Sequence, residues 1–368
     1  MILTTSPAFR YELEEVWLPV SENILAWEHD FHQLMLDDQI RMVAYKNAIQ
    51  DAVKPGMVVL DLGTGTGILG LWALQAGAKY LYAIDVNAAV IPEAIATFER
   101  GGFSGKYQIF HGLSYDIKLP NQVDLIISEI IGNLGDNEDF IPILDDARKR
   151  FLKPNGRMLP RSVRSQLVPV SAVRAHQQVA AQECRALNTS YSLPELMQRL
   201  AIKSPFNLYY DAIITRRCYL SEPKVAKNFL FDGSDQQVYV TELTYGVTLD
   251  GLLTGFKGSF IAELSDAVVL DISGDDIAAR TTSDSWKHCY LPLQDPLNVK
   301  QGDEIRLRFS RSYPELRDSP FRQCYQWSGK VVRNGEVMGA FSQSTCSRRL
   351  NIDPLCRLNI DPGRTAVF

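Results

Sequence analysis

A strand that runs directly into a glycine-rich turn is the feature that most constrains the fold of this 368-residue chain. Val58–Gly67 reads VVLDLGTGTG, and a helical stretch, Ile68–Ala76, follows it. Glycines after a strand permit a tight turn and let a ligand approach the backbone, while the helix N-terminus offers unpaired N–H groups. The next strand-like run ends at Asp85, where a carboxylate is placed to accept hydrogen bonds from ribose hydroxyls. The segment therefore predicts a nucleoside-bearing cofactor at the carboxyl end of a parallel strand.

Two classes of cofactor fit this turn. Gly65–Gly70 reads GTGILG and matches the dinucleotide fingerprint GxGxxG, which is a weak signal alone. Asp61 stands at the strand end just before the glycines, where its charge would repel a pyrophosphate. S-adenosylmethionine has no phosphate, and a nearby carboxylate attracts its ammonium group. Because Gly63 places the turn directly after the strand and leaves Gly70 inside the helix, we predict S-adenosylmethionine as the cofactor and a class I methyltransferase as the class of protein.

The pattern of apolar and polar residues along the chain predicts two domains. Over residues 31–160, strand-like runs alternate with amphipathic stretches, which is typical of a doubly wound parallel sheet. Residues 161–342 contain period-two runs punctuated by Gly, Asp and Ser, as in an antiparallel sandwich or barrel. Residues 171–202 are rich in Ala and Gln with helical spacing and interrupt these runs as a helical insertion. We expect residues 1–30 to form an N-terminal segment and residues 343–368, which carry RLNIDP twice, to form a tail.

Periodicity also predicts the individual elements of both domains. The first domain is expected to contain the strands Val58–Leu62, Tyr80–Asp85, Tyr107–Phe110 and Val123–Ser128, helices at about 36–53, 67–76, 88–100 and 140–151, and a turn at Lys153–Gly156. The second is expected to contain the strands Ser165–Pro169, Gln237–Leu243, Gly258–Leu264, Ala267–Ile272, Glu304–Phe309 and Gln326–Val332.

Composition fits an ordinary soluble globular protein, with 46% apolar and 22% charged residues. No apolar run approaches the roughly 18–20 residues that cross a bilayer, and acidic residues interrupt the N-terminus where a secretory signal would stay apolar. A net charge of −5 argues against a broad nucleic-acid surface. The six cysteines and five histidines show no metal-ligand spacing. We therefore expect reduced thiols, a cytoplasmic location, no metal, no membrane and no nucleic acid.

A second group of chemistry-bearing residues follows the strand Val123–Ser128. Glu129 stands at the carboxyl end of that strand, where ligands gather in this type of sheet, and Glu138 returns after a glycine-containing loop. Two carboxylates that face each other repel unless a cation lies between them, so the pair predicts binding of a guanidinium. The alternative for Glu138 is a solvated helix start, where acidic residues favour the helix dipole.

These motifs resemble those of the protein arginine methyltransferase family. VLDLGTGTGIL is similar to the family's cofactor motif, SEIIGNLGDNE to its double-glutamate loop, and His32–Arg41 to its helix His-x-x-Met-Leu-x-Asp-x-x-Arg. The DNE ending of the loop and Asp284-Ser285-Trp286, which stands in place of Thr-His-Trp, are closest to the symmetric-dimethylating (type II) branch. The resemblance spans about residues 25–340. It implies a Rossmann-like domain followed by an antiparallel β-barrel, with residues 171–202 as the arm of a homodimer.

The resemblance also implies a set of site residues. Arg41 would pair with the cofactor's carboxylate, although an exposed helix cation is the alternative, and Trp286 would wall the pocket, although ordinary barrel core is the alternative. Ser285 replaces the histidine that normally pairs with Asp38, so a charged dyad is not expected there. The expected catalytic residues are Glu129 and Glu138, the expected cofactor-binding residues are His32, Met35, Arg41, Asp61, Gly63, Gly65, Asp85, Ser114 and Tyr115, and the expected substrate-pocket residues are Ser285 and Trp286.

The resulting hypothesis is an S-adenosylmethionine-dependent N-methyltransferase that acts on an arginine guanidinium of a protein or peptide. A methyltransferase of a small guanidino molecule or a modified peptide is the enzymatic alternative, and a cofactor-binding scaffold is the non-enzymatic one. Retention of both Glu129 and Glu138 weighs against the scaffold. Met35 is expected in asymmetric enzymes whereas the loops favour the symmetric branch, so the sequence leaves the product type open.

Overall fold

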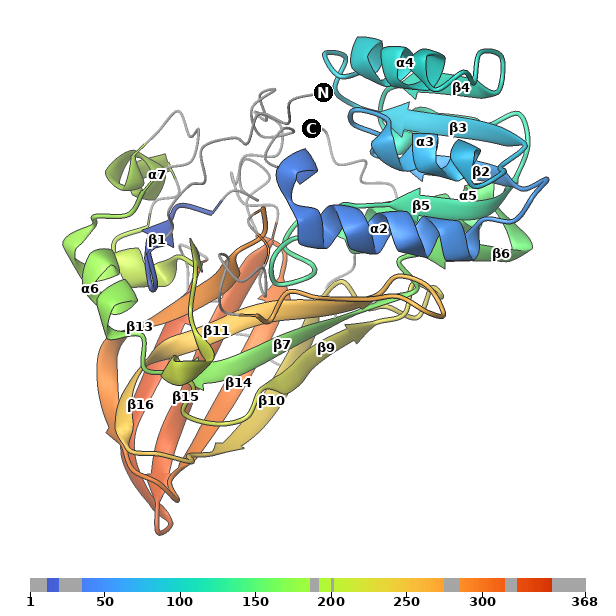
Figure 1. The fold of residues 1–368 in the computed structure, drawn as a ribbon. Coiled ribbons are helices and arrows are strands. Elements are labelled where there is room, and N and C mark those ends of the chain that lie inside the picture. Colours follow the sequence, from blue (N-terminus) through green and yellow to red (C-terminus); the bar gives the residue numbers. More distant parts are fainter. Residues whose placement is uncertain are drawn as a thin grey trace.

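The structure, a computed structural model, contains an α/β domain and a domain of antiparallel sheets (Figure 1). In the view of Figure 1, the α/β domain lies above the sheets of the second domain. The residues that the structure describes are 12–19, 35–185, 192–199, 202–274, 283, 285–314 and 323–345.

The first domain is built on a five-stranded parallel sheet with the order β4-β3-β2-β5-β6. β2 lies between β3 and β5, and its last four residues are buried. Because β2 and β5 are parallel neighbours, the loops that follow them lie at the same edge of the sheet. The chain passes from β2 to β3 on one side and returns to the other side as β5, which leaves a crevice between these loops. The bounds are β2 Val58–Leu62, β3 Tyr80–Asp85, β4 Tyr107–His111, β5 Val123–Ser128 and β6 Leu152–Leu159.

Helices accompany this sheet and confirm the predicted Rossmann-like alternation. α3 is the most apolar of them, and it buries Leu69, Trp72 and Leu74 in the core that it shares with β2 and β3. Each such side chain stabilises the fold by roughly 1.5–3 kcal/mol. The helices are α2 Gln39–Ala52, α3 Ile68–Gln75, α4 Ile91–Arg100 and α5 Phe140–Phe151, with a 3-10 turn, η2, at Ser114–Asp116.

The turn predicted at Lys153–Gly156 is wrong, because these residues lie inside β6. Val123 of β5 pairs with Leu152, and Leu125 pairs with Arg157, so β6 has extra residues between two neighbouring pairs. The strand therefore bulges where the sequence KPNG favours a turn, and it resumes its parallel pairing afterwards.

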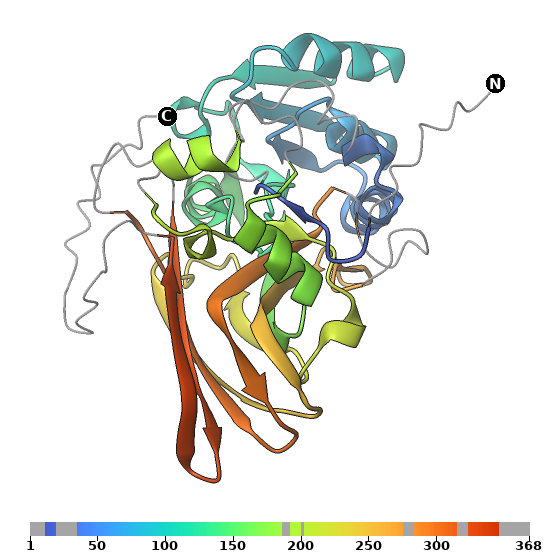
Figure 2. The same cartoon turned by 90° about the vertical axis from the view of Figure 1, so that its left-hand side faces the viewer.

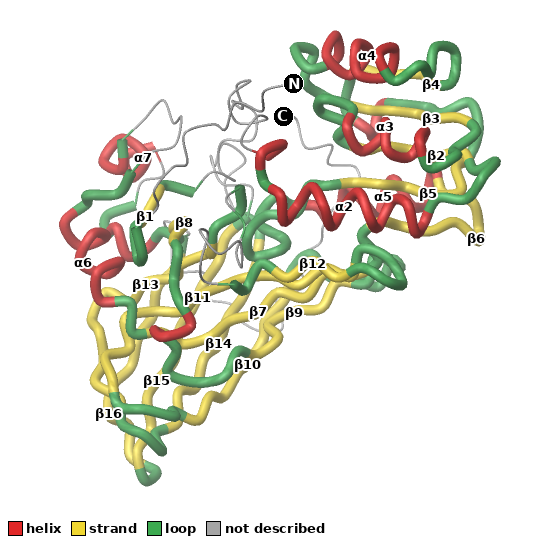
Figure 3. The backbone as a smooth tube through the Cα atoms, in the orientation of Figure 1, coloured by secondary structure: helices red, strands yellow, loops and turns green. Residues whose placement is uncertain are grey.

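The second domain consists of two antiparallel sheets (Figure 3). β9 runs beside β10 and β13 beside β16, so the two sheets come together as a barrel-like lobe around one apolar core. One sheet contains β1 Val16–Trp17, β8 Tyr210–Ala212, β13 His288–Val299, β11 Gly251–Glu263, β7 Ser162–Val170 and β9 Lys224–Phe229, with β12 Val269–Asp271 on β11. The other contains β10 Tyr239–Gly246, β14 Glu304–Ser312, β15 Cys324–Arg333 and β16 Glu336–Ser344.

The helical insertion contains α6 (Val173–Ala181), which lies beside β1 (Figure 2), and α7 (Leu193–Arg199). β1 belongs to the segment that the sequence sets apart at the N-terminus, yet it pairs with β8. Glu14, just before β1, accepts hydrogen bonds from the backbone N–H groups of Arg174 and Ala175. The N-terminal segment thus caps α6 from 160 residues away, where Ala172 offers no capping side chain.

Cysteine chemistry departs from the expectation of reduced thiols at one position. Cys324, at the start of β15, is disulfide-bonded, whereas Cys184, Cys218 and Cys289 are free. The cytoplasmic location, which was inferred in part from reduced thiols, stays a prediction. The two RLNIDP copies lie outside the described residues. In the described ranges, no helix combines the length and apolarity that a membrane span requires.

Candidate active site

The glycine turn after β2 adopts a backbone conformation that explains its sequence. Gly63, Gly65 and Gly67 have φ values of 75°, 51° and 82°, the left-handed region that side chains with a Cβ rarely adopt. The N–H groups of Gly63 and Thr64 both donate to the carbonyl of Ile84 on β3, at 2.9 and 3.0 Å. The turn is therefore held against the end of the neighbouring strand, with Gly63 exposed at the edge of the sheet.

Asp61 is fully buried beneath this turn. Its Oδ2 accepts hydrogen bonds from the Thr64 hydroxyl at 2.7 Å and from the Gly70 N–H at 2.9 Å, whereas its Oδ1 has no hydrogen-bond partner in the described part of the chain. Burial raises the pKa of Asp61 to about 6. Gly70 is required for this approach, because a Cβ there would lie 2.7 Å from Leu81 and 3.0 Å from Asp61. Gly70, the last glycine of the GxGxxG match, thus allows α3 to pack closely and donates a hydrogen bond to Asp61.

Asp85, at the end of β3, lies beside the same turn. One carboxylate oxygen accepts from the Gly65 N–H and the other from the Asn87 N–H, each at 2.8 Å. A carboxylate has about four acceptor sites, so both oxygens retain the capacity to accept from ribose hydroxyls. The left-handed glycines, the half-buried Asp85 and the buried unpartnered Oδ1 of Asp61 together fit S-adenosylmethionine.

The predicted adenine contacts lie in η2, after β4. Ser114 is buried and Tyr115 is half-buried, and burial raises the pKa of Tyr115 to about 12. Arg150 of α5 donates to the carbonyls of Ser114 at 2.6 Å and Ile117 at 2.8 Å, and Asp146 holds it in an ion pair. Arg150 therefore positions this turn. Its role could not be predicted from the sequence, because the carbonyls that it contacts lie 36 and 33 residues before it.

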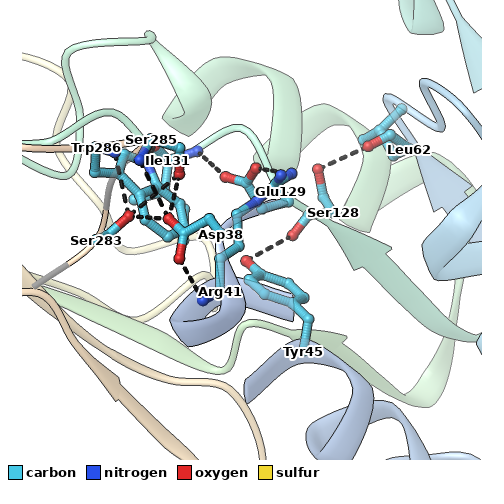
Figure 4. Close-up of polar contacts among 10 residues, drawn as sticks. All are labelled: Asp38, Arg41, Tyr45, Leu62, Ser128, Glu129, Ile131, Ser283, Ser285 and Trp286. Atoms are coloured by element: carbon cyan, nitrogen blue, oxygen red, sulfur yellow. Dashed lines mark hydrogen bonds and ion pairs between the residues drawn. The ribbon is translucent and has the colours of Figure 1, made fainter. Parts of the chain in front are cut away.

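α2 carries the residues that join the two domains (Figure 4). Asp38 is the N-cap of α2 and accepts from the Arg41 N–H at 3.1 Å. The hydroxyl of Ser285 also donates to Asp38, at 2.6 Å, and so does that of Ser283. A neutral pair of serines thus contacts Asp38, and no charged dyad forms there, as the sequence predicts. Ser283 was missed by the sequence analysis, although it stands two residues before Ser285.

Arg41 forms an ion pair with Glu129 (Figure 4), a contact that the sequence analysis did not predict. The side chains are 12% and 7% exposed, so both charges are shielded from water. The Cζ atom of Arg41 lies 5.8 Å from the centroid of the Trp286 ring, within the range of a cation–π interaction. The alternative that Arg41 is an exposed helix cation is therefore wrong.

Trp286 lies between the two domains and contacts residues of both. Its indole N–H donates to the carbonyl of Ile131 at 2.5 Å, and its ring packs edge-on against Phe260 with centroids 5.0 Å apart. It is 8% exposed. Trp286 is therefore part of the barrel core, and it also contacts both the double-glutamate loop and Arg41.

A short hairpin shapes the double-glutamate loop. The N–H and carbonyl groups of Gly132 and Gly135 bond to each other at 3.0 and 2.8 Å, and Asn133-Leu134 forms the turn between them. A Cβ on Gly132 would lie 2.1 Å from the side chain of Asn137, so the close fold requires this glycine. Glu129 and Glu138 each stand three residues outside the glycine pair, so the hairpin directs the chain back from one glutamate toward the other.

The acids after the hairpin lead into the start of α5, but they are shielded from solvent. Asp136 is 0% exposed and Asp139 is 19% exposed, and both are ion-paired with Arg311 of the second domain. Glu138 lies between them and is half-buried. Of the other predicted residues, Met35 is half-buried in a helical stretch just before Asp38, whereas His32 and Asp284 lie outside the described residues.

Replacing Asp38 with alanine is expected to lower the free energy of unfolding by about 1–3 kcal/mol, because α2 loses its N-cap and two hydroxyls lose their buried acceptor. Asp38→Asn is expected to lose less, since the amide oxygen still caps the helix. Urea titration of both variants measures the difference. An equal loss in both would mean that the charge of Asp38, and not its capping oxygen, stabilises the junction.

The fold and the glycine turn are those of the S-adenosylmethionine-dependent methyltransferase class. Residues 45–160 match the family model of ribosomal protein L11 methyltransferase (PrmA), and residues 162–333 match that of the PRMT5 oligomerisation domain. Protein arginine N-methyltransferase PRMT10 of Oryza sativa subsp. japonica is 37% identical over 339 residues, which cover 82% of this chain and 87% of that protein. The chain belongs to the protein arginine N-methyltransferase family.

Two further comparisons define the extent of the similarity. Probable protein arginine N-methyltransferase 6 of Arabidopsis thaliana is 34% identical over 160 residues, or 42% of this chain, and the chain spans 37% of its length. The Trypanosoma brucei PRMT1 enzyme-prozyme heterotetrameric complex with AdoHcy contains a chain of the same fold, with a TM-score of 0.72 and 19% identity. That similarity covers 86% of this chain and 98% of the other.

Proposed function

We propose that this protein transfers a methyl group from S-adenosylmethionine to a guanidinium nitrogen of arginine in a protein or peptide. The observation that carries the proposal is the ion pair between Glu129 and the guanidinium of Arg41. The carboxylate at the end of β5 already binds a guanidinium, and the indole of Trp286 lies within cation–π range of it. A site with this chemistry suits the guanidinium of a substrate as well.

The residues of the site are suited to hold a guanidinium and to polarise it. When bound, S-adenosylmethionine supplies a methyl group on a sulfonium sulfur, which suits an in-line displacement. Arginine stays protonated with a pKa above roughly 12, so no side chain can act as a strong base toward it. Glu129 and Glu138 would instead fix the guanidinium plane and keep its positive charge on the nitrogens that they bind. The attacking nitrogen then has an available lone pair, and a carboxylate accepts its proton after methyl transfer.

Positioning supplies much of the expected rate. When an enzyme holds two reacting atoms about 3–3.5 Å apart and in line, the effective concentration of one reactant at the other is very high. The paired glycines of the hairpin, the Asp38 cap and the Trp286 contact all restrict the surroundings of Glu129. Of these contacts, that of Trp286 with the carbonyl of Ile131 joins the second domain to the first.

Incubation with methyl-labelled S-adenosylmethionine tests the proposal. The acceptors are an arginine-rich peptide and, separately, a cell lysate, and products are identified by mass spectrometry. Label on peptide arginine is the expected result. Label confined to small metabolites would support the alternative of a small-molecule methyltransferase, and label nowhere would contradict both enzymatic hypotheses.

We propose further that the product is symmetric dimethylarginine. The DNE ending of the double-glutamate loop and the serine of the Asp-Ser-Trp loop support this branch, as does the match of residues 162–333 to the PRMT5 oligomerisation domain. Met35, by contrast, is the residue expected of asymmetric enzymes. The isomer of dimethylarginine that the protein forms therefore decides between the symmetric and the asymmetric branch. Fragmentation of the dimethylated peptide distinguishes the two isomers by their neutral losses.

We also propose that the protein is a homodimer that uses the α6–α7 arm. The match to an oligomerisation domain supports this, and Val173 at the start of α6 exposes 41% of its surface. Light scattering measures the molar mass in solution. A mass of one chain over a range of concentrations would contradict the proposal.

A further inference from the structure

A row of three buried polar side chains crosses the second antiparallel sheet. Arg311 of β14 pairs in register with Tyr239 of β10 on one side and with Tyr325 of β15 on the other. Residues directly opposite in an antiparallel sheet share a face, so the three side chains point the same way. On β14 this is the core-facing side, since Ile305, Leu307 and Phe309 are also buried while Arg306 and Arg308 are exposed. An arginine therefore occupies a core position at the end of the strand.

All three side chains of this row contact the carboxylate of Asp136 in the double-glutamate loop. Tyr325 donates to its Oδ1 at 2.8 Å, Tyr239 donates to its Oδ2 at 2.9 Å, and Nε of Arg311 lies 3.2 Å from Oδ2. Arg311 and Asp136 are both completely buried. A charge in the core is unfavourable unless it is paired, so the sheet is built to receive this carboxylate.

Asp139 extends the same contacts past Glu138. Nη2 of Arg311 lies 2.5 Å from its Oδ1, and the hydroxyl of Tyr313 donates to that oxygen at 2.8 Å. Asp139 is the N-cap of α5, yet its side chain makes no capping hydrogen bond, and its φ of 57° lies in the left-handed region. Its carboxylate is thus directed to Arg311 in place of the helix N-terminus, where an N-cap aspartate usually points.

One guanidinium therefore holds the residues on both sides of Glu138, two positions before it and one position after it. A third contact, from the side-chain amide of Gln323 to the carbonyl of Asn137 at 2.6 Å, fixes the residue between. Glu129, by contrast, is bound to Arg41 from α2. The two glutamates are thus oriented from different domains.

We propose that Arg311, with Tyr313 and Tyr325, is a positioning residue that orients Glu138 toward the substrate guanidinium by holding Asp136 and Asp139. Arg311 does not itself touch substrate or cofactor in this scheme. The inference rests on the proposed arginine methylation, and it adds that the second domain sets the geometry of one of the two carboxylates. A shift of Glu138 weakens transfer without affecting the cofactor turn after β2.

The test removes single hydroxyls, because the loss of Arg311 itself can unfold the sheet. Tyr313→Phe and Tyr325→Phe each remove one donor to the loop. Tyr245→Phe is the matched control, since Tyr245 is a buried tyrosine of β10 whose hydroxyl donates to the carbonyl of Leu167, away from the loop. We expect kcat on an arginine peptide to fall about 10-fold in the first two variants. The control is expected to keep its kcat, and the Kd of S-adenosylmethionine is expected to stay unchanged in all three.

A double-mutant cycle tests whether the effect passes through Glu138. In a Glu138→Gln background, Tyr313→Phe is expected to cause no further loss of kcat, because the group that it orients has already lost its charge. Arg311→Lys is expected to retain more activity than Arg311→Met, since lysine still supplies a cation to both aspartates. Equal kcat in Tyr313→Phe, Tyr325→Phe and Tyr245→Phe, or additive losses in the cycle, would overturn the inference while the wild-type protein still methylates arginine. A wild-type protein inactive on arginine peptides would overturn the proposed function, and this inference with it.

Discussion

Exchange of either Glu129 or Glu138 for glutamine is expected to lower kcat on an arginine peptide by about 100-fold or more. The amide has nearly the same shape as the carboxylate but carries no charge, so it no longer holds the positive charge of the guanidinium away from the attacking nitrogen. Glu129→Gln is also expected to lower the melting temperature, because Arg41 is 12% exposed and loses its partner.

The measurement is steady-state kinetics with labelled S-adenosylmethionine, paired with calorimetric titration of the cofactor. Glu242→Gln is the matched control, since Glu242 is 76% exposed on β10 and pairs with Arg308 on the outside of the sheet. It is expected to behave as the wild type. Full turnover by both Glu129→Gln and Glu138→Gln would exclude a role for these carboxylates in catalysis.

Asp61→Asn is expected to raise the Kd of S-adenosylmethionine by about 10- to 100-fold, because a charge-assisted contact to the cofactor's ammonium is lost. The protein is expected to fold, since the amide oxygen can still accept from Thr64 and Gly70 in place of Oδ2. Asp124→Asn is the control: Asp124 lies on the adjacent strand β5 and bonds to the Val58 N–H and to Lys153. An unchanged Kd in Asp61→Asn would mean that Asp61 serves only to hold the turn.

The pH dependence of binding gives a second readout for the same residue. Burial raises the pKa of Asp61 from 3.8 to about 6, so the folded protein without ligand takes up a proton between these values. The free energy of unfolding therefore falls, through this group, as the pH rises from about 4 to about 6. The ammonium requires the carboxylate form, so the wild-type affinity is expected to fall about tenfold per pH unit below pH 6. Asp61→Asn is expected to lack this dependence.

Local patterns were sufficient for four strands of the parallel sheet, β2 to β5. β2, β3 and β5 have the predicted bounds, because continuous apolar runs between turn signals define buried strands without reference to distant residues. The antiparallel sheets were harder to predict. β13 was missed because Pro292 and Pro296 interrupt its alternation, and β8 was missed because it is only three residues long. The KPNG segment was misread because its pairing with β5 outweighs its turn propensity.

The site residues likewise divide into those that the sequence predicts and those that it does not. Asp61, Gly63, Gly65 and Asp85 meet around one turn because they follow adjacent parallel strands, a relation that the order of strands and helices already implies. Arg311 could not be assigned from the sequence, since its partners Asp136 and Asp139 lie more than 170 residues away. The one local sign was an arginine at an inward-facing position of an otherwise apolar alternation.

The sequence by itself determined the class of fold, the turn that receives the cofactor and the two glutamates, because each depends on residues close together in the chain. Only the tertiary structure decided which groups orient those glutamates. Arg41 binds Glu129 from α2, and Arg311 holds the residues around Glu138 from β14. Both contacts are buried ion pairs between segments distant in the chain. The packing of the distant segments determines which charges meet in these ion pairs. A charge that becomes buried must have an opposite charge beside it, and the sequence does not show which residues become neighbours.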